Sequence, residues 1–154
     1  MTQTKNTFET IYEVGKFSAR INGTDYEIVR NGHKVVETLK FDQYDEEEVV
    51  EYVDKCEYAN SKILEIKTTI DSIVNLGNTY KTFKNAVEVL DNLDTPNYMK
   101  YDVLDLTKKL IRMMVWASSP MFLTEDANTE MMMFSMMNND LNEVQKTIHK
   151  IITL

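Results

Sequence analysis

The chain has 154 residues, which is enough for one domain and hardly for two. It holds 17 basic and 25 acidic residues, and its formal net charge of −8 disfavours direct binding to nucleic acid through a general positive field. One cysteine excludes a disulfide framework and a cysteine-based zinc site, and two histidines argue against a multi-histidine metal centre.

The first 41 residues carry the pattern of a short antiparallel sheet. Two Asn-Gly pairs, at positions 22–23 and 31–32, separate runs in which apolar and polar residues alternate. An Asn-Gly pair between such runs is a strong hairpin signal, because a type I′ turn needs positive φ at both central residues. We therefore expect a three-stranded meander, while residues 7–14 are compatible with either a short helix or a further strand.

From residue 44 onward, apolar residues recur at helical spacing. A heptad seam of four repeats consists of Val49, Tyr52, Cys56, Ala59, Ile63, Ile66, Ile70 and Ile73. Asp45 or Asp42 can cap the start of this helix, and Gly77 suits its end. A helix over residues 45–76 would be about 48 Å long at about 1.5 Å per residue, so its seam needs a long partner from this chain or from another copy.

Three further helical segments follow. The second helix covers residues 80–90, the third begins with Asp102 as its cap, and the fourth begins after Thr124. Residues 138–140, Asn-Asn-Asp, can bend or split the fourth segment, so we expect four or five helices in all.

This pattern predicts an α+β fold: a short N-terminal antiparallel β-meander followed by a mostly helical bundle with one long heptad-patterned helix. We expect a single domain over residues 1–154, with a β subregion over 1–41 and a helical subregion over 42–154. Residues 1–13 show no secretion signal, and the longest apolar stretch, residues 113–123, is too short to cross a bilayer of about 30 Å. We expect a cytoplasmic protein that does not contact a membrane.

The sequence contains no phosphate-binding glycine loop, nucleophile elbow or metalloprotease motif. Cys56 occupies a seam position, where a small buried hydrophobe is a better interpretation than a nucleophile. A calcium loop starting at Asp42 fails, because Glu47 and Val53 stand where that loop needs a glycine and a bidentate glutamate. We therefore expect no enzyme activity, no catalytic residue, no metal site and no cofactor.

Most of the charge imbalance lies in one segment. Residues 42–57 hold eight acidic residues and one lysine, a net charge of −7. One interpretation is a solvated helix start, where the helix dipole favours carboxylates. The other is an acidic face, interleaved with tyrosines, that resembles nucleic acid in charge and docks on a basic or nucleic-acid-binding protein. The candidate residues of this face are Asp45, Glu46, Glu47, Glu48, Glu51 and Asp54.

Half of the ten methionines lie within residues 131–137. Successive helical residues are about 100° apart, so this run cannot bury every side chain on one face. The stretch is either a helix buried all round, or an interface between copies or with an apolar partner segment, for which flexible methionines are suited. Trp116 is either a core anchor or an interface hot spot. The candidate residues of this apolar surface are Trp116, Met131, Met132, Met133, Phe134, Met136 and Met137.

The segment from Ala19 to Ile28 reads A-R-I-N-G-T-D-Y-E-I. It resembles the opening hairpin of many small phage structural and assembly proteins, among them the tail-assembly chaperones. Those proteins are similar to this chain in being short, acidic and mostly helical after the hairpin, whereas the long heptad helix and the methionine run depart from their pattern. The resemblance implies a chaperone that coats an extended phage protein during assembly, and it transfers no catalytic residue.

The sequence favours a non-catalytic interaction protein, of the phage assembly or chaperone type, that binds a partner protein through its apolar and acidic surfaces. A homo-oligomer formed through the apolar surface is also compatible with the pattern. The alternative is an acidic phage anti-defence inhibitor, resembling anti-CRISPR proteins, that occupies the nucleic-acid-binding site of a host enzyme. Either role would place the protein in the cytoplasm of the host cell.

Overall fold

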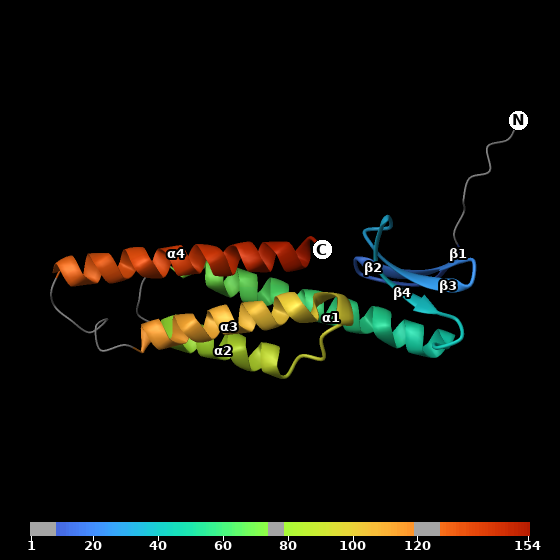
Figure 1. Ribbon diagram of the computed structural model, residues 1–154, viewed down its shortest axis with the longest axis horizontal. Coiled ribbons are helices and arrows are strands. Elements are labelled where there is room, and N and C mark those ends of the chain that lie inside the picture. Colours follow the sequence, from blue (N-terminus) through green and yellow to red (C-terminus); the bar gives the residue numbers. More distant parts are fainter. Residues whose placement is uncertain (1–8, 74–78, 119–126) are drawn as a thin grey trace, which may run out of the picture. The chain divides into compact units, whose positions relative to one another are not determined.

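A computed structural model describes residues 9–73, 79–118 and 127–154, without the side chains of 127–130, 133 and 134 (Figure 1). It confirms the α+β class, because a four-stranded antiparallel sheet precedes the helices. The chain divides into two compact units, residues 1–59 and 60–154, and the division falls within the long first helix.

The sheet of the first unit has the strand order β1-β2-β3-β4, a simple meander. Its strands are β1 (Glu9–Val14), β2 (Phe17–Asn22), β3 (Asp25–Arg30) and β4 (Lys34–Lys40). The predicted meander is therefore confirmed and extended, since the segment over residues 7–14 forms a strand along residues 9–14. This strand pairs with β2 through a register shift between Thr10 and Tyr12.

The two predicted turns differ in detail. Asn31 and Gly32 have φ angles of 54° and 77°, as a type I′ turn requires, and the His33 N–H donates to the Arg30 carbonyl across 3.3 Å. At the earlier turn Asn22 pairs with Asp25, so the turn residues are 23 and 24 rather than 22 and 23. Gly23, with φ of 63°, then supplies the positive φ at the first central position, as in a type II′ turn.

One face of the sheet packs against the first half of α1 (Glu46–Asp71). Tyr12 pairs across the sheet with Ala19, and Glu37 pairs with Ile28, so these residues share a face. Both Tyr12 and Glu37 bond to residues of α1, which places the helix on that face. The buried core of this unit includes Phe17, Ala19, Ile28, Leu39, Val49, Val53, Cys56 and Ala59.

The second unit consists of the end of α1 and the helices α2 (Thr79–Asp91), α3 (Lys100–Ala117) and α4 (Ala127–Ile152), with a 3₁₀ turn over Asn97–Met99. Within this unit α3 packs against both α2 and α4. Its buried core includes Ile63, Ile66, Ile70, Phe83, Leu90, Met99, Leu106, Leu110, Met113, Val144, Ile148 and Ile151. The heptad seam is thus buried by the chain itself from Val49 to Ile70, apart from the half-buried Tyr52.

The helix boundaries differ from the prediction at three places. α1 ends at Asp71, short of the predicted residue 76. α3 begins at Lys100, so Asp102 lies in its first turn rather than capping it. α4 continues through residues 138–140 without a break, because the burial of Met137 and Val144 on one face outweighs the low helix propensity of asparagine. The predicted caps Thr124 and Gly77 lie outside the described residues.

Candidate functional site

The predicted acidic face begins with a reciprocal cap on α1. The Glu48 N–H donates to Oδ1 of Asp45 across 2.8 Å, and the Asp45 N–H donates to Oε1 of Glu48 across 3.3 Å. This is a capping box, in which two carboxylates satisfy two amides that the helix leaves without partners. Two of the six candidate acids therefore hold the helix start, and the D-x-x-E spacing at residues 45–48 was the sequence signal for it.

Two more acids of the segment fasten the sheet to α1. The Tyr12 hydroxyl donates to Oδ1 of Asp54 across 2.5 Å, and this bond to a carboxylate raises the pKa of Tyr12. The backbone N–H of Lys16 donates to Oε2 of Glu57 across 3.1 Å. These contacts lie on β1 and at the turn that follows it, and they give Asp54 a structural role within the first unit.

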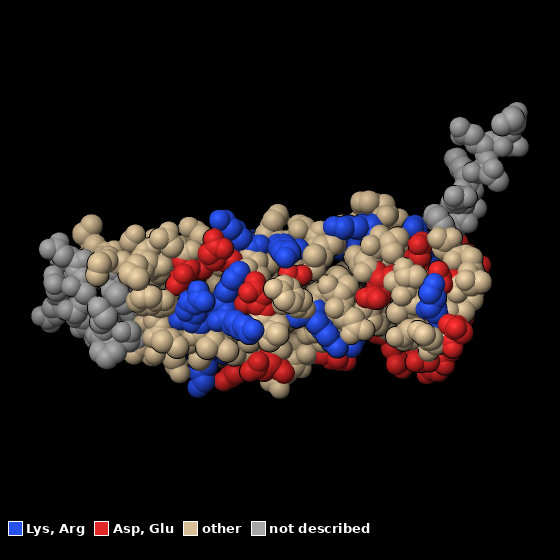
Figure 2. Space-filling model, viewed as in Figure 1, with Lys and Arg blue, Asp and Glu red and all other residues tan. Residues whose placement is uncertain are grey.

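Glu46, Glu47 and Glu51 remain exposed at the start of α1. In the described part of the chain these three side chains form neither a hydrogen bond nor an ion pair. Figure 2 shows Asp and Glu side chains gathered over this end of α1. We call these three residues the acidic surface, since they are the members of the predicted face that carry charge without a local partner.

The methionine run divides between the core and the exterior. Met131, Met132 and Met136 are 72%, 54% and 41% exposed, whereas Met137 is 2% exposed. Met137 lies one heptad before Val144 and two before Ile151, so it joins the buried face of α4 and is not available to a partner. We call Met131, Met132 and Met136 the methionine face. The side chains of Met133 and Phe134 lie outside the described residues.

Trp116 is half-buried near the end of α3. It stands seven residues after Lys109, so both side chains project from the same side of α3. Nζ of Lys109 lies 2.8 Å from Oγ1 of Thr147 on α4, which shows that this side of α3 faces α4. Trp116 therefore stands on the α4-facing side of α3, partly covered and partly open to solvent.

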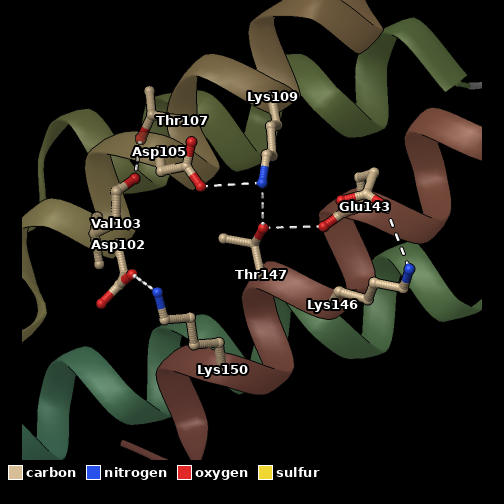
Figure 3. A network of polar contacts seen from close by, with 9 residues as sticks. All are labelled: Asp102, Val103, Asp105, Thr107, Lys109, Glu143, Lys146, Thr147 and Lys150. Carbon is tan, nitrogen blue, oxygen red and sulfur yellow. Dashed lines mark hydrogen bonds and ion pairs between the residues drawn. The ribbon is translucent and has the colours of Figure 1, made fainter.

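A polar network that the sequence pattern does not predict joins α3 to α4 (Figure 3). Lys150 lies 2.9 Å from Asp102, and Lys109 lies 3.0 Å from Asp105 while donating to Thr147. The Thr147 hydroxyl in turn donates to the Glu143 carbonyl across 2.9 Å. The network fixes α3 beside α4, and its two contacts between the helices join residues 38 and 48 positions apart, which no local pattern can reveal.

Two features of the described residues bear on chemistry, the thiol of Cys56 and an open hollow beside the sheet. Burial, with a smaller contribution from the negative charge of Glu37, raises the pKa of Cys56 to about 12, so its thiol stays protonated at neutral pH. No cluster of three potential metal ligands occurs in the described ranges. An open hollow of about 510 Å³ beside the β1–β2 turn is lined by residues that include Glu13, Lys16 and Arg20. Of these residues, Arg20 is paired with Glu27 across 2.9 Å.

Comparisons with protein families, with characterised proteins and with solved structures find no match for this chain. Among the described residues, no helix is both long enough and apolar enough to cross a membrane.

Proposed function

We propose that this protein is a non-catalytic interaction protein, an assembly or chaperone-like factor of the phage type, that binds a partner protein through the methionine face. The observation that carries the proposal is the exposure of Met131, Met132 and Met136 within two turns of one helix. Large apolar side chains gathered on an exposed surface mark a binding site more often than chance exposure does.

Methionine suits such a role physically. Its side chain is unbranched and its sulfur is polarisable, so a methionine surface repacks around apolar segments of different shapes. Trp116, half-buried on α3, is a further apolar candidate for the same partner, since tryptophan is enriched among residues that dominate binding energy. The α3–α4 network supports the arrangement because it fixes the two helices that carry these side chains.

The test compares the natural chain with a Met132→Asp/Met136→Asp variant as bait in extracts of the native host. Val89→Asp is the matched control, since Val89 is 37% exposed on α2 and lies away from the methionine face. We expect the natural chain and the control to retain one stoichiometric partner by intact-complex mass, and the methionine variant to lose it. Equal retention by all three proteins would contradict the proposal, as would turnover of a small molecule by the purified chain.

A second candidate function rests on the acidic surface. Glu46, Glu47 and Glu51 carry negative charge that the described residues leave unpaired, and a site that binds nucleic acid presents the complementary charge. In this role the protein is an inhibitor that occupies the nucleic-acid-binding site of a host enzyme. Both candidate functions operate without catalytic residues or cofactors, and both belong in the host cytoplasm.

Charge reversal separates the two functions. For the inhibitor we expect Glu47→Lys to weaken partner binding and to reduce its dependence on salt, because screening acts on the lost attraction. Glu88→Lys on α2 is the matched control, since Glu88 is likewise exposed and changes the net charge equally. If Glu47→Lys and Glu88→Lys bind alike while the methionine variant fails, the assembly role stands and the inhibitor role is rejected.

A further inference from the structure

α3 carries a second apolar stripe that its own unit does not cover. Tyr101, Leu104, Ile111 and Val115 are 78%, 55%, 45% and 65% exposed, although all four are large apolar side chains. The buried stripe of the same helix is separate and consists of Val103, Leu106, Leu110 and Met113. A helix with two apolar stripes has one more packing surface than its own unit uses.

The exposed stripe has the spacing of a coiled-coil seam. Tyr101, Leu104, Lys108, Ile111 and Val115 follow one another at intervals of three, four, three and four residues. Lys108 is the single polar member, and it is exposed in the middle of the stripe. We call these five residues the α3 stripe. It is distinct from the methionine face, which lies on α4, and from the acidic surface, which lies on α1.

Two opposite charges flank one edge of the α3 stripe. Asp105 and Arg112 are seven residues apart, so they project on the same side of the helix, where Asp105 neighbours Tyr101 and Lys108 and Arg112 neighbours Lys108 and Val115. Asp105 bonds to Lys109 across 3.0 Å, with its side chain still 42% exposed. Arg112 is exposed, and within the described ranges it has no ion-pair partner. Figure 2 shows Lys and Arg side chains gathered over the later part of α3.

We propose that α3 is a dimerisation helix, which pairs antiparallel with α3 of a second copy of this chain. A twofold axis makes the two stripes cover each other. In an antiparallel coiled coil, the first heptad position of one helix packs against the fourth position of the other. Leu104 therefore lies against the partner's Val115. Lys108 lies against the partner's Ile111 in the same register.

Lys108 decides the direction of the pair. In a parallel dimer the two Lys108 side chains would occupy one layer, with like charges opposed at the centre of the seam. The antiparallel register staggers them, so each long aliphatic stem covers apolar surface while its ammonium reaches water. A polar residue at one seam position therefore selects orientation at some cost in affinity.

The flanking charges match in the same orientation. Residues on the edge formed by Tyr101, Lys108 and Val115 meet their counterparts across an antiparallel seam, so Asp105 lies opposite the partner's Arg112. The twofold axis repeats this contact, which yields two ion pairs in each dimer. An 18-residue helix presents a small interface, so the dimer is weak and depends on protein concentration.

The first experiment is sedimentation velocity of the full chain over a concentration series. We expect a monomer–dimer equilibrium for the natural chain. In the Leu104→Glu/Ile111→Glu variant, the concentration at which half of the protein is dimeric should rise about tenfold or more, because the new carboxylates would lose their water in the seam. Val89→Glu is the matched control, with similar exposure on α2 and no place in the stripe. Far-UV circular dichroism checks that each variant keeps its helices.

The second experiment exchanges the flanking charges. The Arg112→Asp chain carries two acids along this edge and the Asp105→Arg chain carries two arginines, so each repels its own copy. An equimolar mixture pairs acid with arginine at both contacts. We therefore expect each variant alone to be monomeric and the mixture to dimerise as the natural chain does.

Three outcomes would overturn the proposal. The natural chain could remain monomeric at every concentration, the Leu104→Glu/Ile111→Glu variant could associate like the control, or the mixture of charge variants could stay monomeric. A monomeric chain whose α3 stripe instead binds vesicles containing anionic lipid would assign the surface to a membrane and reject the dimer.

Discussion

Nζ of Lys150, on α4, lies 2.9 Å from Oδ1 of Asp102, on α3, and the Asp102 side chain is only 11% exposed. The hydrogen bond and the charge of Asp102 raise the pKa of Lys150 above its ordinary value of 10.5. A carboxylate this well covered depends on its partner, because water no longer solvates it fully.

Replacement of Lys150 by methionine is therefore expected to destabilise the second unit. Lys150→Met leaves the Asp102 carboxylate without its ammonium, whereas Lys146→Met removes only an exposed pair with Glu143. In chemical denaturation, Lys150→Met should unfold at a lower midpoint denaturant concentration than the natural chain. The midpoint of Lys146→Met should stay almost unchanged. The double variant Asp102→Asn/Lys150→Met should recover part of the loss, since no charge is then stranded.

The pH dependence of that loss follows from the direction of the pKa shift. A group whose pKa is raised in the folded protein stabilises the fold at pH values below its ordinary pKa. This contribution disappears as the pH rises through the pKa of the folded state. The difference between the natural chain and Lys150→Met should stay constant through neutral pH and shrink only above about 10.5. A difference that changed between pH 6 and 8 would point to another titrating group.

At the start of α1, the acids of the capping box should contribute to stability, whereas the exposed acids beside them should not. Asp45→Ala removes the oxygen that accepts the Glu48 N–H, and loss of an N-cap costs about 1 kcal/mol. Asp45→Asn keeps an acceptor oxygen and should cost little. Glu46→Ala removes an exposed charge, and we expect a change within about 0.5 kcal/mol. Urea denaturation measures all three, and equal losses for Asp45→Ala and Glu46→Ala would refute the assigned cap.

Gly15 is a second position where the structure predicts a specific cost. Its φ is +57°, and a Cβ there would lie 2.2 Å from Cδ of Glu57, the side chain that accepts from the Lys16 N–H. Gly23 has a similar φ of +63° with open space around it, so Gly23→Ala measures the conformational cost alone, about 1 kcal/mol. Gly15→Ala should destabilise by more than Gly23→Ala.

The same pair of variants has an internal control. Glu57→Ala removes the side chain that the new Cβ would strike, so Gly15→Ala should cost less in a Glu57→Ala background than in the natural chain. An additive double variant would show that Glu57 moves aside freely.

The local sequence pattern was sufficient to predict the burial of the heptad seam and one of the two turns. The seam residues from Val49 to Ile70 repeat over four heptads, and one repeat reinforces the next, so their shared burial could be predicted. Asn31-Gly32 could be predicted because positive φ at two successive residues has few sequence solutions. β1 could not, because its pairing with β2 depends on the irregularity between Thr10 and Tyr12, which only the partner strand reveals.

The candidate surfaces were predictable in part for the same reason. Met136 and Met137 are adjacent and identical, and only the phase set by Val144 and Ile151 separates the exposed residue from the buried one. That phase was readable in the sequence. By contrast, the bond between Asp102 and Lys150 joins residues 48 positions apart, and the docking of α3 on α4 creates it, so helix-cap patterns assigned Asp102 a different role.

Cys56 offers a chemical probe of the first unit. Burial is the main cause that raises its pKa to about 12, so at pH 8 the thiolate fraction is on the order of 10⁻⁴. The Cys56 side chain is also fully buried, on the side of α1 that faces the sheet. We expect a thiol reagent to label the native protein far more slowly than the unfolded protein, at a rate set by opening of this unit. Asp54→Ala, which removes the acceptor of the Tyr12 hydroxyl, should accelerate labelling, whereas Lys146→Met in the second unit should not. Rapid, stoichiometric labelling of the native chain would show that the sheet does not hold the first half of α1 as described.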